Sequence, residues 1–251
     1  MSLLAESPAA AAATGDRRIR VWDLPLRLFH WLLVAAIAVA FLSSEEESAL
    51  NAYHMLSGWL AAVLIAFRLV WGIVGGEYAR FAGFVKPSAL GHHVGELLRG
   101  RPSATVGHNA LGALSVILLL AVVAATVWTG ATLGAGADEE LHEIIAWTLL
   151  ALVAVHVLAV LTMSLLTREN LIAAMFSGRK AARLHADARD ARRAGLLGLV
   201  LAVVAVAGTV VAIRAYDPDA FTLRSTEAFE HRQSGETSMR DEAAEGEHDD
   251  D

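Results

Sequence analysis

The chain has 251 residues, of which 55% are hydrophobic; its mean hydropathy is +0.49 and its formal net charge is −7. This composition excludes an ordinary soluble domain, because several runs approach the roughly 20 apolar residues that cross ~30 Å of hydrocarbon. The absence of cysteine excludes disulfides, thiolate-bound iron–sulfur clusters and covalent c-type haem attachment. The sequence therefore predicts a polytopic α-helical membrane protein. Its expected partner is the lipid bilayer, and no binding to nucleic acid is expected. Any redox metal is expected to be bound by histidine.

Five apolar segments follow a short N-terminal tail. Residues 1–18 lack the basic and apolar regions of a cleaved signal, and we expect a disordered cytoplasmic tail there. Spanning helices are expected at about 24–42, 50–74, 108–133, 139–166 and 195–213. Pro25 suits the first turn of the first helix, where its missing N–H costs nothing. The fold class is thus all-α: a four-helix membrane bundle over residues 19–166, with a fifth C-terminal transmembrane helix over 195–214.

Basic residues alternate between the two sides of the predicted spans. They are frequent before the first span, in the second connection and in the fourth connection, 167–194. The first connection carries Glu45, Glu46 and Glu47 and no basic residue, and the third connection also has none. The positive-inside rule therefore predicts a bacterial inner-membrane protein with a cytoplasmic N-terminus and a periplasmic C-terminus. The last segment, 215–251, is acidic and is expected to be a disordered periplasmic tail.

Four histidines fall inside the predicted spans: His30, His54, His142 and His156. Taken singly, each fits a neutral imidazole hydrogen-bonded between helices, or an interfacial residue. Their depths favour a common purpose, because His54 and His142 lie near external span ends and His30 and His156 lie nearer the cytoplasm. Fourteen residues of helix separate His142 from His156, which gives ~21 Å of rise and ~40° of rotation, so both occupy one face at two depths.

Two level histidine pairs at that separation fit two stacked b-type haems in a four-helix core, each with two axial imidazoles. His54 and His142 would bind the external haem iron, and His30 and His156 would bind the iron on the cytoplasmic side. A zinc site built from all four residues is not expected, because the two levels lie too far apart for one ion.

Other residues near these histidines have two interpretations each. Arg68 lies fourteen residues after His54 on nearly the same face, where it either pairs with a haem propionate or reaches the membrane interface. His108 opens the third span and either lies near a quinone site or caps the span at the interface. Gly58 and Gly112, each one turn after a histidine, either admit a flat macrocycle or pack against a helix. The remaining histidines are expected to be solvated: His92, His93, His185, His231 and His248.

Seven short stretches jointly carry a resemblance to a known family. They are VWDLPLRLFH (21–30), HMLSG (54–58), FRLVWG (67–72), YARF (78–81), GHNALG (107–112), RENL (168–171) and GRK (178–180). Over about residues 19–181 the chain resembles the bacterial cytochrome b561 and nickel-hydrogenase b-type cytochrome family. The resemblance implies two non-covalent haem b groups, with His30, His54, His142 and His156 as axial ligands. The fifth span lies outside the familiar core, and Ala110 stands where many relatives have proline.

Two functions are compatible with these features. The resemblance implies electron transfer between the quinone pool and a periplasmic redox partner, either a c-type cytochrome or a hydrogenase-like enzyme. The alternative is a superoxide:quinone oxidoreductase. Acidic residues at 45–47, at 138–140 and in the tail lie on the predicted external face, where they would repel superoxide and favour a basic partner. The sequence therefore favours an electron-transfer subunit.

Overall fold

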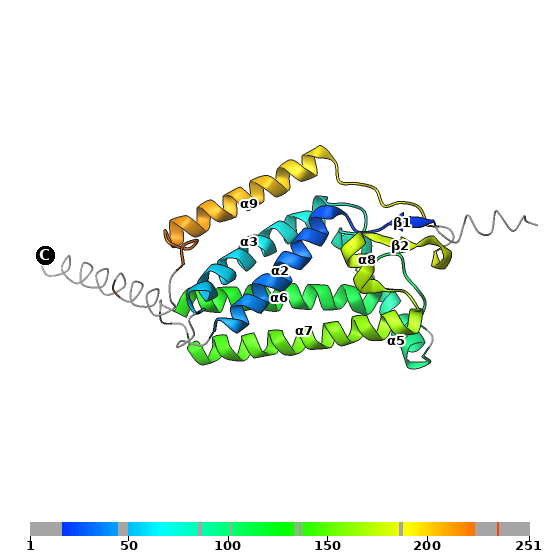
Figure 1. Ribbon diagram of the computed structural model, residues 1–251, viewed down its shortest axis with the longest axis horizontal. Helices are drawn as coiled ribbons and strands as arrows, with labels where there is room; N and C mark the ends of the chain where they lie inside the picture. Colours follow the sequence, from blue (N-terminus) through cyan, green and yellow to red (C-terminus); the bar gives the residue numbers. More distant parts are fainter. Residues whose placement is uncertain are drawn as a thin grey trace, which may run out of the picture. The chain divides into compact units, whose positions relative to one another are not determined.

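The computed structural model describes residues 17–44, 50–84, 87–100, 102–133, 136, 138–185, 188–223 and 235. Within these residues, five helices are long and apolar enough to cross a membrane (Figure 1): α2 (Leu24–Leu42), α3 (Ala52–Val74), α6 (Ala110–Thr132), α7 (Glu139–Thr167) and α9 (Leu196–Tyr216). The shorter elements are α4 (Phe81–Phe84), α5 (Pro87–Leu98), α8 (Leu171–Ser177), β1 (Arg18–Arg20), β2 (Arg179–Ala181) and a 3-10 turn (Ala182–Leu184). The prediction of a helical membrane bundle with a fifth spanning helix is confirmed.

Some helix ends differ from the predicted ones. α6 begins at Ala110 rather than 108, because the Asn109 side chain accepts the Gly112 N–H at 2.7 Å and caps the helix. α7 begins at Glu139 as predicted, directly after Asp138, whose carboxylate accepts the Glu140 N–H at 3.0 Å. These ends depend on single side-chain caps, which a hydropathy pattern does not locate to the residue.

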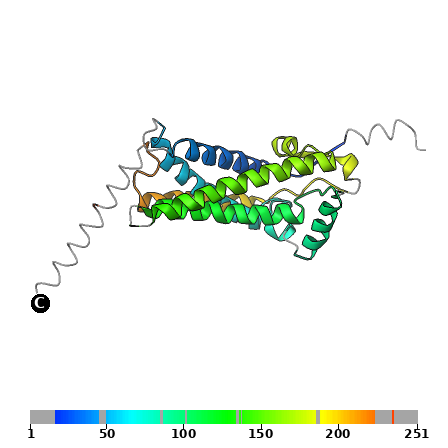
Figure 2. The ribbon, with the colours of Figure 1, turned by 90° about the horizontal axis from the view of Figure 1, so that it is seen from below.

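The chain divides into two compact units. Unit 1 comprises Met1–His30, Arg68–Leu118 and Val153–Val203, and unit 2 comprises Trp31–Phe67, Leu119–Leu152 and Val204–Asp251. Each unit contains a part of every spanning helix. Within each unit α6 and α7 lie side by side, as Figures 1 and 2 both show.

A two-stranded antiparallel ribbon, β1 with β2, lies beside α8 in unit 1 (Figure 1). Ile19 pairs with Lys180 in its centre, and both residues are buried. Gly178, which precedes β2, has a φ of 75°, and its carbonyl accepts the N–H groups of Val21 and Trp22. A Cβ at Gly178 would lie 2.6 Å from the Trp22 carbonyl oxygen, so the position requires glycine. The ribbon was not predicted, because three-residue strands show too little alternation to be detected.

The Asp23 carboxylate connects three parts of unit 1. It caps α2 by accepting the Leu26 N–H at 2.9 Å. It also accepts the Trp71 indole N–H at 3.1 Å and the Gly76 N–H at 3.1 Å. Trp71 is only 2% exposed, so this carboxylate takes the place of water for its indole N–H. The first and third of the stretches that carry the family resemblance therefore meet at one side chain.

Replacing Asp23 by alanine is expected to destabilise unit 1 by about 2–4 kcal/mol, because it removes a helix cap and leaves a buried indole N–H unsatisfied. Thermal unfolding of the detergent-solubilised protein, followed by circular dichroism, measures the loss. Asp190→Ala is the matched control, since the Asp190 side chain is 57% exposed and pairs with Arg20 at 3.5 Å. Equal destabilisation by the two variants would contradict the role assigned to Asp23.

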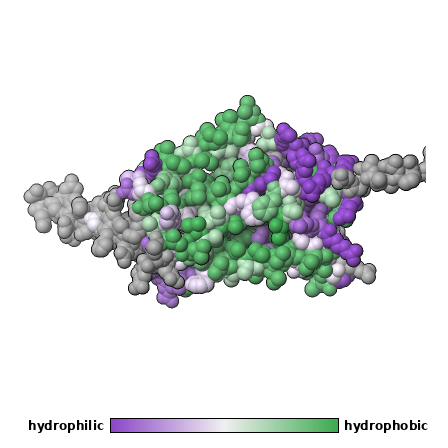
Figure 3. Space-filling view, in the orientation of Figure 1, coloured by the Kyte–Doolittle hydropathy of each residue, from purple (hydrophilic) through white to green (hydrophobic). Residues whose placement is uncertain are grey.

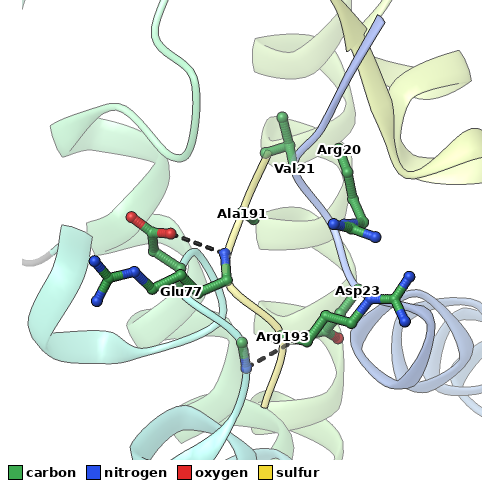
Figure 4. Close-up of a pocket in the computed structure, with 8 residues that line it drawn as sticks. Arg20, Val21, Asp23, Glu77, Ala191 and Arg193 are labelled. Carbon is green, nitrogen blue, oxygen red and sulfur yellow. Dashed lines mark hydrogen bonds between the residues drawn. The ribbon is translucent and has the colours of Figure 1, made fainter. Parts of the chain in front are cut away.

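The segment after β2 is attached to the rest of unit 1 by hydrogen bonds to charged side chains, and Figure 4 shows the bond between Arg192 and Glu77. The Glu77 carboxylate accepts the Arg192 N–H at 2.9 Å and the Arg189 guanidinium at 3.0 Å. The Arg20 N–H donates to Asp190 at 2.7 Å. In its described residues the predicted basic connection is therefore a folded part of unit 1 that includes α8 and β2, rather than a simple linker.

In unit 2, the end of α9 is fixed to α3. The Trp59 indole N–H donates to the Asp217 carboxylate at 3.1 Å, and both side chains are buried. Apolar residues of the two segments share a hydrophobic cluster with Trp59: Met55, Val63, Ile213 and Ala220. The structure thus differs from the predicted tail at its start, because α9 continues to Tyr216 and Asp217 is buried. Residues 1–16 and most of the predicted tail lie outside the described residues.

The spanning helices present an apolar surface. Of the most hydropathic stretch of α7, only 6% is buried, and large aliphatic side chains are exposed along it. Figure 3 shows hydrophobic residues over the spanning helices and hydrophilic residues gathered near the β1–β2 ribbon. An exterior of this kind matches lipid rather than water, and the chain is a multi-pass membrane protein.

Candidate functional site

His54 of α3 and His142 of α7 face each other in unit 2. Their ring centroids are 6.4 Å apart and their planes are inclined by 87°. A metal ion bonded at about 2 Å to one nitrogen of each ring would place the two centroids roughly 6 Å apart. The two rings therefore already have the separation that a shared metal ion requires.

A neighbouring helix holds the second nitrogen of each ring. The His54 Nδ1–H donates to the Ala40 carbonyl of α2 at 2.9 Å, which leaves a lone pair on Nε2. His142 Nδ1 lies 2.9 Å from the Thr129 hydroxyl of α6. Because that hydroxyl donates to the Ala125 carbonyl at 3.0 Å, the His142 Nδ1–H donates to it and Nε2 again keeps its lone pair. Such outer hydrogen bonds are typical of metal-binding histidines.

Glycines shape the space beside this pair. A Cβ at Gly58 would meet nothing within 4 Å, so open space lies one turn after His54. A Cβ at Gly130 would lie 2.9 Å from His142, which means that glycine lets α6 approach that ring. Gly112 differs, since a Cβ there would lie 3.1 Å from the Asn109 cap. The open space supports the macrocycle interpretation of Gly58, whereas Gly112 serves the start of α6.

The predicted second pair, His30 of α2 and His156 of α7, lies in unit 1. Both residues are half-buried. The Ser115 hydroxyl of α6 lies 3.3 Å from His156 Nδ1. The Thr129 hydroxyl has the same position relative to His142 Nδ1, at 2.9 Å. Ser115 and Thr129 are fourteen residues apart, as are His142 and His156. This matched spacing of hydroxyls and imidazoles is present in the sequence, which does not show that the hydroxyls face the imidazoles.

Arg68 is buried in unit 1, with an exposed fraction of only 1%. Its guanidinium carbon lies 4.4 Å from the centroid of the Phe81 ring. Its Nη1 is buried and has no hydrogen-bond partner among the described residues. A buried N–H of a cation without an acceptor is costly, so the arrangement suits an added anionic or carbonyl group. The alternative that Arg68 reaches the membrane interface does not match its burial.

His108 lies in the segment before α6, outside the spanning helix. Its ring centroid is 4.7 Å from that of Trp22. Burial lowers the pKa of His108, and the positive charges of Arg68 and Lys180 act in the same direction. His108 is therefore near two cations of unit 1, while Asn109 rather than His108 caps α6.

The prediction of solvated histidines holds for one described residue and fails for another. The His92 side chain is 77% exposed and pairs with Glu96 at 3.3 Å. His185 is instead buried, and its Nε2 lies 3.0 Å from the Glu169 carboxylate. Its position in a polar connection suggested exposure, because sequence does not show that β2 folds this segment inward. The side chains of His93, His231 and His248 lie outside the described residues.

The described residues contain no group of three or more His, Asp or Glu side chains arranged to hold a metal ion. The four histidines are distributed as one pair in each unit. This arrangement fits groups that need only two protein ligands each, as a haem iron does.

A comparison with protein families identifies the class. The family model of prokaryotic cytochrome b561 matches residues 21–178. This match covers more than half of the chain, and the chain belongs to this family. It is thus a membrane b-type cytochrome, and its cofactor is haem b.

Curated relatives are more specific. The chain is 27% identical over 236 residues to a probable Ni/Fe-hydrogenase B-type cytochrome subunit of Rhizobium leguminosarum bv. viciae, covering 72% of this chain and 97% of the relative. It is 26% identical to the protein of the same description in Cupriavidus necator, over 68% of this chain and 90% of the relative. A probable Ni/Fe-hydrogenase 1 B-type cytochrome subunit of Escherichia coli K12 is 24% identical, over 63% and 88%. No solved structure matches the chain.

Thr129→Val tests the support of His142. The change removes the acceptor of the Nδ1–H and is expected to weaken haem binding in unit 2 by about 10–100-fold. Haem titration of the purified protein, followed by the absorbance of the reduced cytochrome, measures the loss. Thr132→Val is the control, because the Thr132 hydroxyl bonds the Trp128 carbonyl of its own helix at 2.9 Å. Equal haem affinity of the two variants would show that Thr129 does not support the site.

Proposed function

We propose that this chain carries two haem b groups and transfers electrons across the bacterial inner membrane between the quinone pool and a periplasmic redox enzyme. The observation that carries the proposal is the repeated arrangement of a histidine pair with an α6 hydroxyl on the Nδ1 atom of its α7 member. When bound, haem b supplies an iron centre that takes up and releases one electron.

Each residue of the two pairs has a defined task in this proposal. The Nε2 atoms of His54 and His142 would hold one iron, and His30 and His156 would hold the other. The Ala40 carbonyl and the Thr129 hydroxyl orient the first pair, and the Ser115 hydroxyl orients His156. Because α7 is uninterrupted from Glu139 to Thr167, one helix supplies a ligand to both groups.

Unit 1 also contains the groups suited to a quinone and a haem propionate. Arg68 offers a buried guanidinium N–H to a propionate. His108 lies beside Trp22 and near Arg68, so a quinone carbonyl would find donors and an aromatic surface there. We therefore assign the quinone end of the chain to unit 1.

Charge supports the orientation in the membrane. Unit 1 holds the basic residues of β1, β2 and the connections, whereas Arg214 is the one Lys or Arg of unit 2 in the described part of the chain. By the positive-inside rule, the basic residues of unit 1 lie at the cytoplasmic face. The N-terminus is then cytoplasmic and the C-terminus periplasmic.

The partner at the periplasmic face is proposed to be a hydrogenase-like enzyme, since the curated relatives are described as hydrogenase cytochrome subunits. A basic c-type cytochrome is the other candidate. Exposed acidic residues at the start of α7, Asp138, Glu139 and Glu140, favour a basic docking surface on either partner. The same charges repel superoxide, so they disfavour the superoxide:quinone oxidoreductase activity.

Haem content decides the proposal most directly. Pyridine haemochrome analysis of the purified full-length protein is expected to give two haem b groups per chain. Decylubiquinol added without oxygen is expected to exchange electrons with these groups, as measured by the reduced-minus-oxidised spectrum. One haem per chain, or no exchange with the quinol, would contradict a transmembrane relay.

A further inference from the structure

A second group of ionisable side chains lies buried in unit 1, away from the histidine pairs. The Glu169 carboxylate accepts the Lys180 ammonium at 2.8 Å and lies 3.0 Å from His185 Nε2. The exposed fractions of the Lys180 and His185 side chains are 3% each, and that of Glu169 is 6%. Glu169 and the two groups that contact it are therefore screened from water.

This buried triad reaches the segment that carries His108. The Lys180 ammonium also donates to the Thr105 carbonyl at 2.9 Å. The Thr105 hydroxyl in turn donates to the Gly107 carbonyl at 3.0 Å, directly before His108. The partner strand of β2 leads to Trp22, whose ring packs against His108. Hydrogen bonds thus hold the triad beside the segment that carries His108 at the proposed quinone end.

A purely structural role explains the triad poorly. Burying an ion pair has a large desolvation penalty, and apolar side chains of similar volume often stabilise a fold as well or better. The ribbon is already held by its strand pairing and by two N–H bonds to the Gly178 carbonyl. Burial lowers the pKa of Lys180, although its bond to Glu169 opposes that effect, so its proton is held less tightly than that of an exposed lysine.

We propose that Glu169, with Lys180 and His185, forms a proton relay between the cytoplasm and a quinone bound beside His108. Reduction of a quinone to a quinol consumes two electrons and two protons, and oxidation of the quinol releases the same numbers. In the reduction the Lys180 ammonium gives a proton to the quinone oxygen, Glu169 and His185 return one to Lys180, and the cytoplasm supplies one to His185; the oxidation runs in reverse. The inference rests on the proposed function, since it deepens the role of unit 1.

Glu169→Gln is the decisive variant, because it keeps the shape of the side chain and removes its titration. The full-length protein, reduced anaerobically, is mixed in a stopped-flow instrument either with decylubiquinone or with ferricyanide. Oxidation by decylubiquinone is expected to be at least tenfold slower than in wild type, with a larger solvent isotope effect in D₂O. Oxidation by ferricyanide, which takes no proton, is expected to be unchanged.

Glu77→Gln is the matched control, because Glu77 also accepts two donors within unit 1 and undergoes the same exchange. It is expected to keep wild-type rates with both oxidants. A readout without turnover is the infrared difference spectrum between reduced and oxidised protein, in which Glu169→Gln removes a carboxyl band that Glu77→Gln retains.

The outcomes separate the relay from the proposed function. If wild-type protein does not react with decylubiquinone, the proposed function fails first. If wild type reacts and Glu169→Gln reacts equally fast with an equal isotope effect, the relay is wrong and the proposed function stands. If Glu169→Gln is oxidised more slowly by ferricyanide as well, Glu169 has a structural role and the relay is wrong. If Glu169→Gln does not fold, His185→Gln is judged by the same criteria.

Discussion

Alanine in place of His142 is expected to lower the haem content of the purified protein from two haem b groups per chain to one. The substitution removes one of the two rings that stand 6.4 Å apart in unit 2 and leaves the pair in unit 1 intact. His156→Ala is expected to remove the other group, through the pair that Ser115 supports. Low-temperature spectra of the reduced protein distinguish the two losses, because the two sites have different surroundings.

The pairing of the four histidines also predicts which substitutions remove the same haem signal. His54→Ala is expected to reproduce the spectrum of His142→Ala, and His30→Ala that of His156→Ala. His92→Ala serves as the control, since its side chain is 77% exposed and lies outside the spanning helices. If His54→Ala and His142→Ala removed different signals, or if either left both signals in place, the pairing would be wrong.

The sequence was sufficient for the features that depend on hydropathy and periodicity. Five apolar runs gave the spanning helices, because lipid contact requires long uninterrupted apolar segments. Fourteen-residue spacing placed His142 and His156 on one face of a helix, and the structure shows that α7 is continuous through both. Which ring nitrogens hydrogen-bond to Ala40 or Thr129 depends on packing between helices, so these contacts emerged only from the structure.

Other features could not be predicted, because they depend on contacts between distant segments. β1 and β2 are three residues long and lie far apart in the sequence, so neither has a detectable pattern of its own. Their pairing brings Lys180 beside Ile19 and helps bury His185 next to Glu169. A polar connection rich in Arg is usually solvated, so the sequence did not predict the buried triad.

Arg68→Met is expected to lower the midpoint potential of one haem by about 60 mV, which is about 1.4 kcal/mol for a one-electron couple. Arg68 is 1% exposed, so its charge is weakly screened by water. Loss of a nearby positive charge disfavours the added electron and so stabilises the oxidised form. Methionine keeps much of the side-chain volume, so the change tests charge more than packing.

Potentiometric titration of the full-length protein, followed by the absorbance of each haem, measures this shift. It is expected in the haem that His156→Ala removes, because Arg68 and His156 both lie in unit 1. Arg68→Lys should restore part of the potential by retaining the charge without the planar guanidinium. Arg80→Met is the control, since Arg80 is exposed and its Nε–H donates to the Gly75 carbonyl at 2.8 Å. A shift of potential confined to the other haem, or an equal shift from Arg80→Met, would show that Arg68 does not belong to the haem site. The buried guanidinium would then need a different anionic partner.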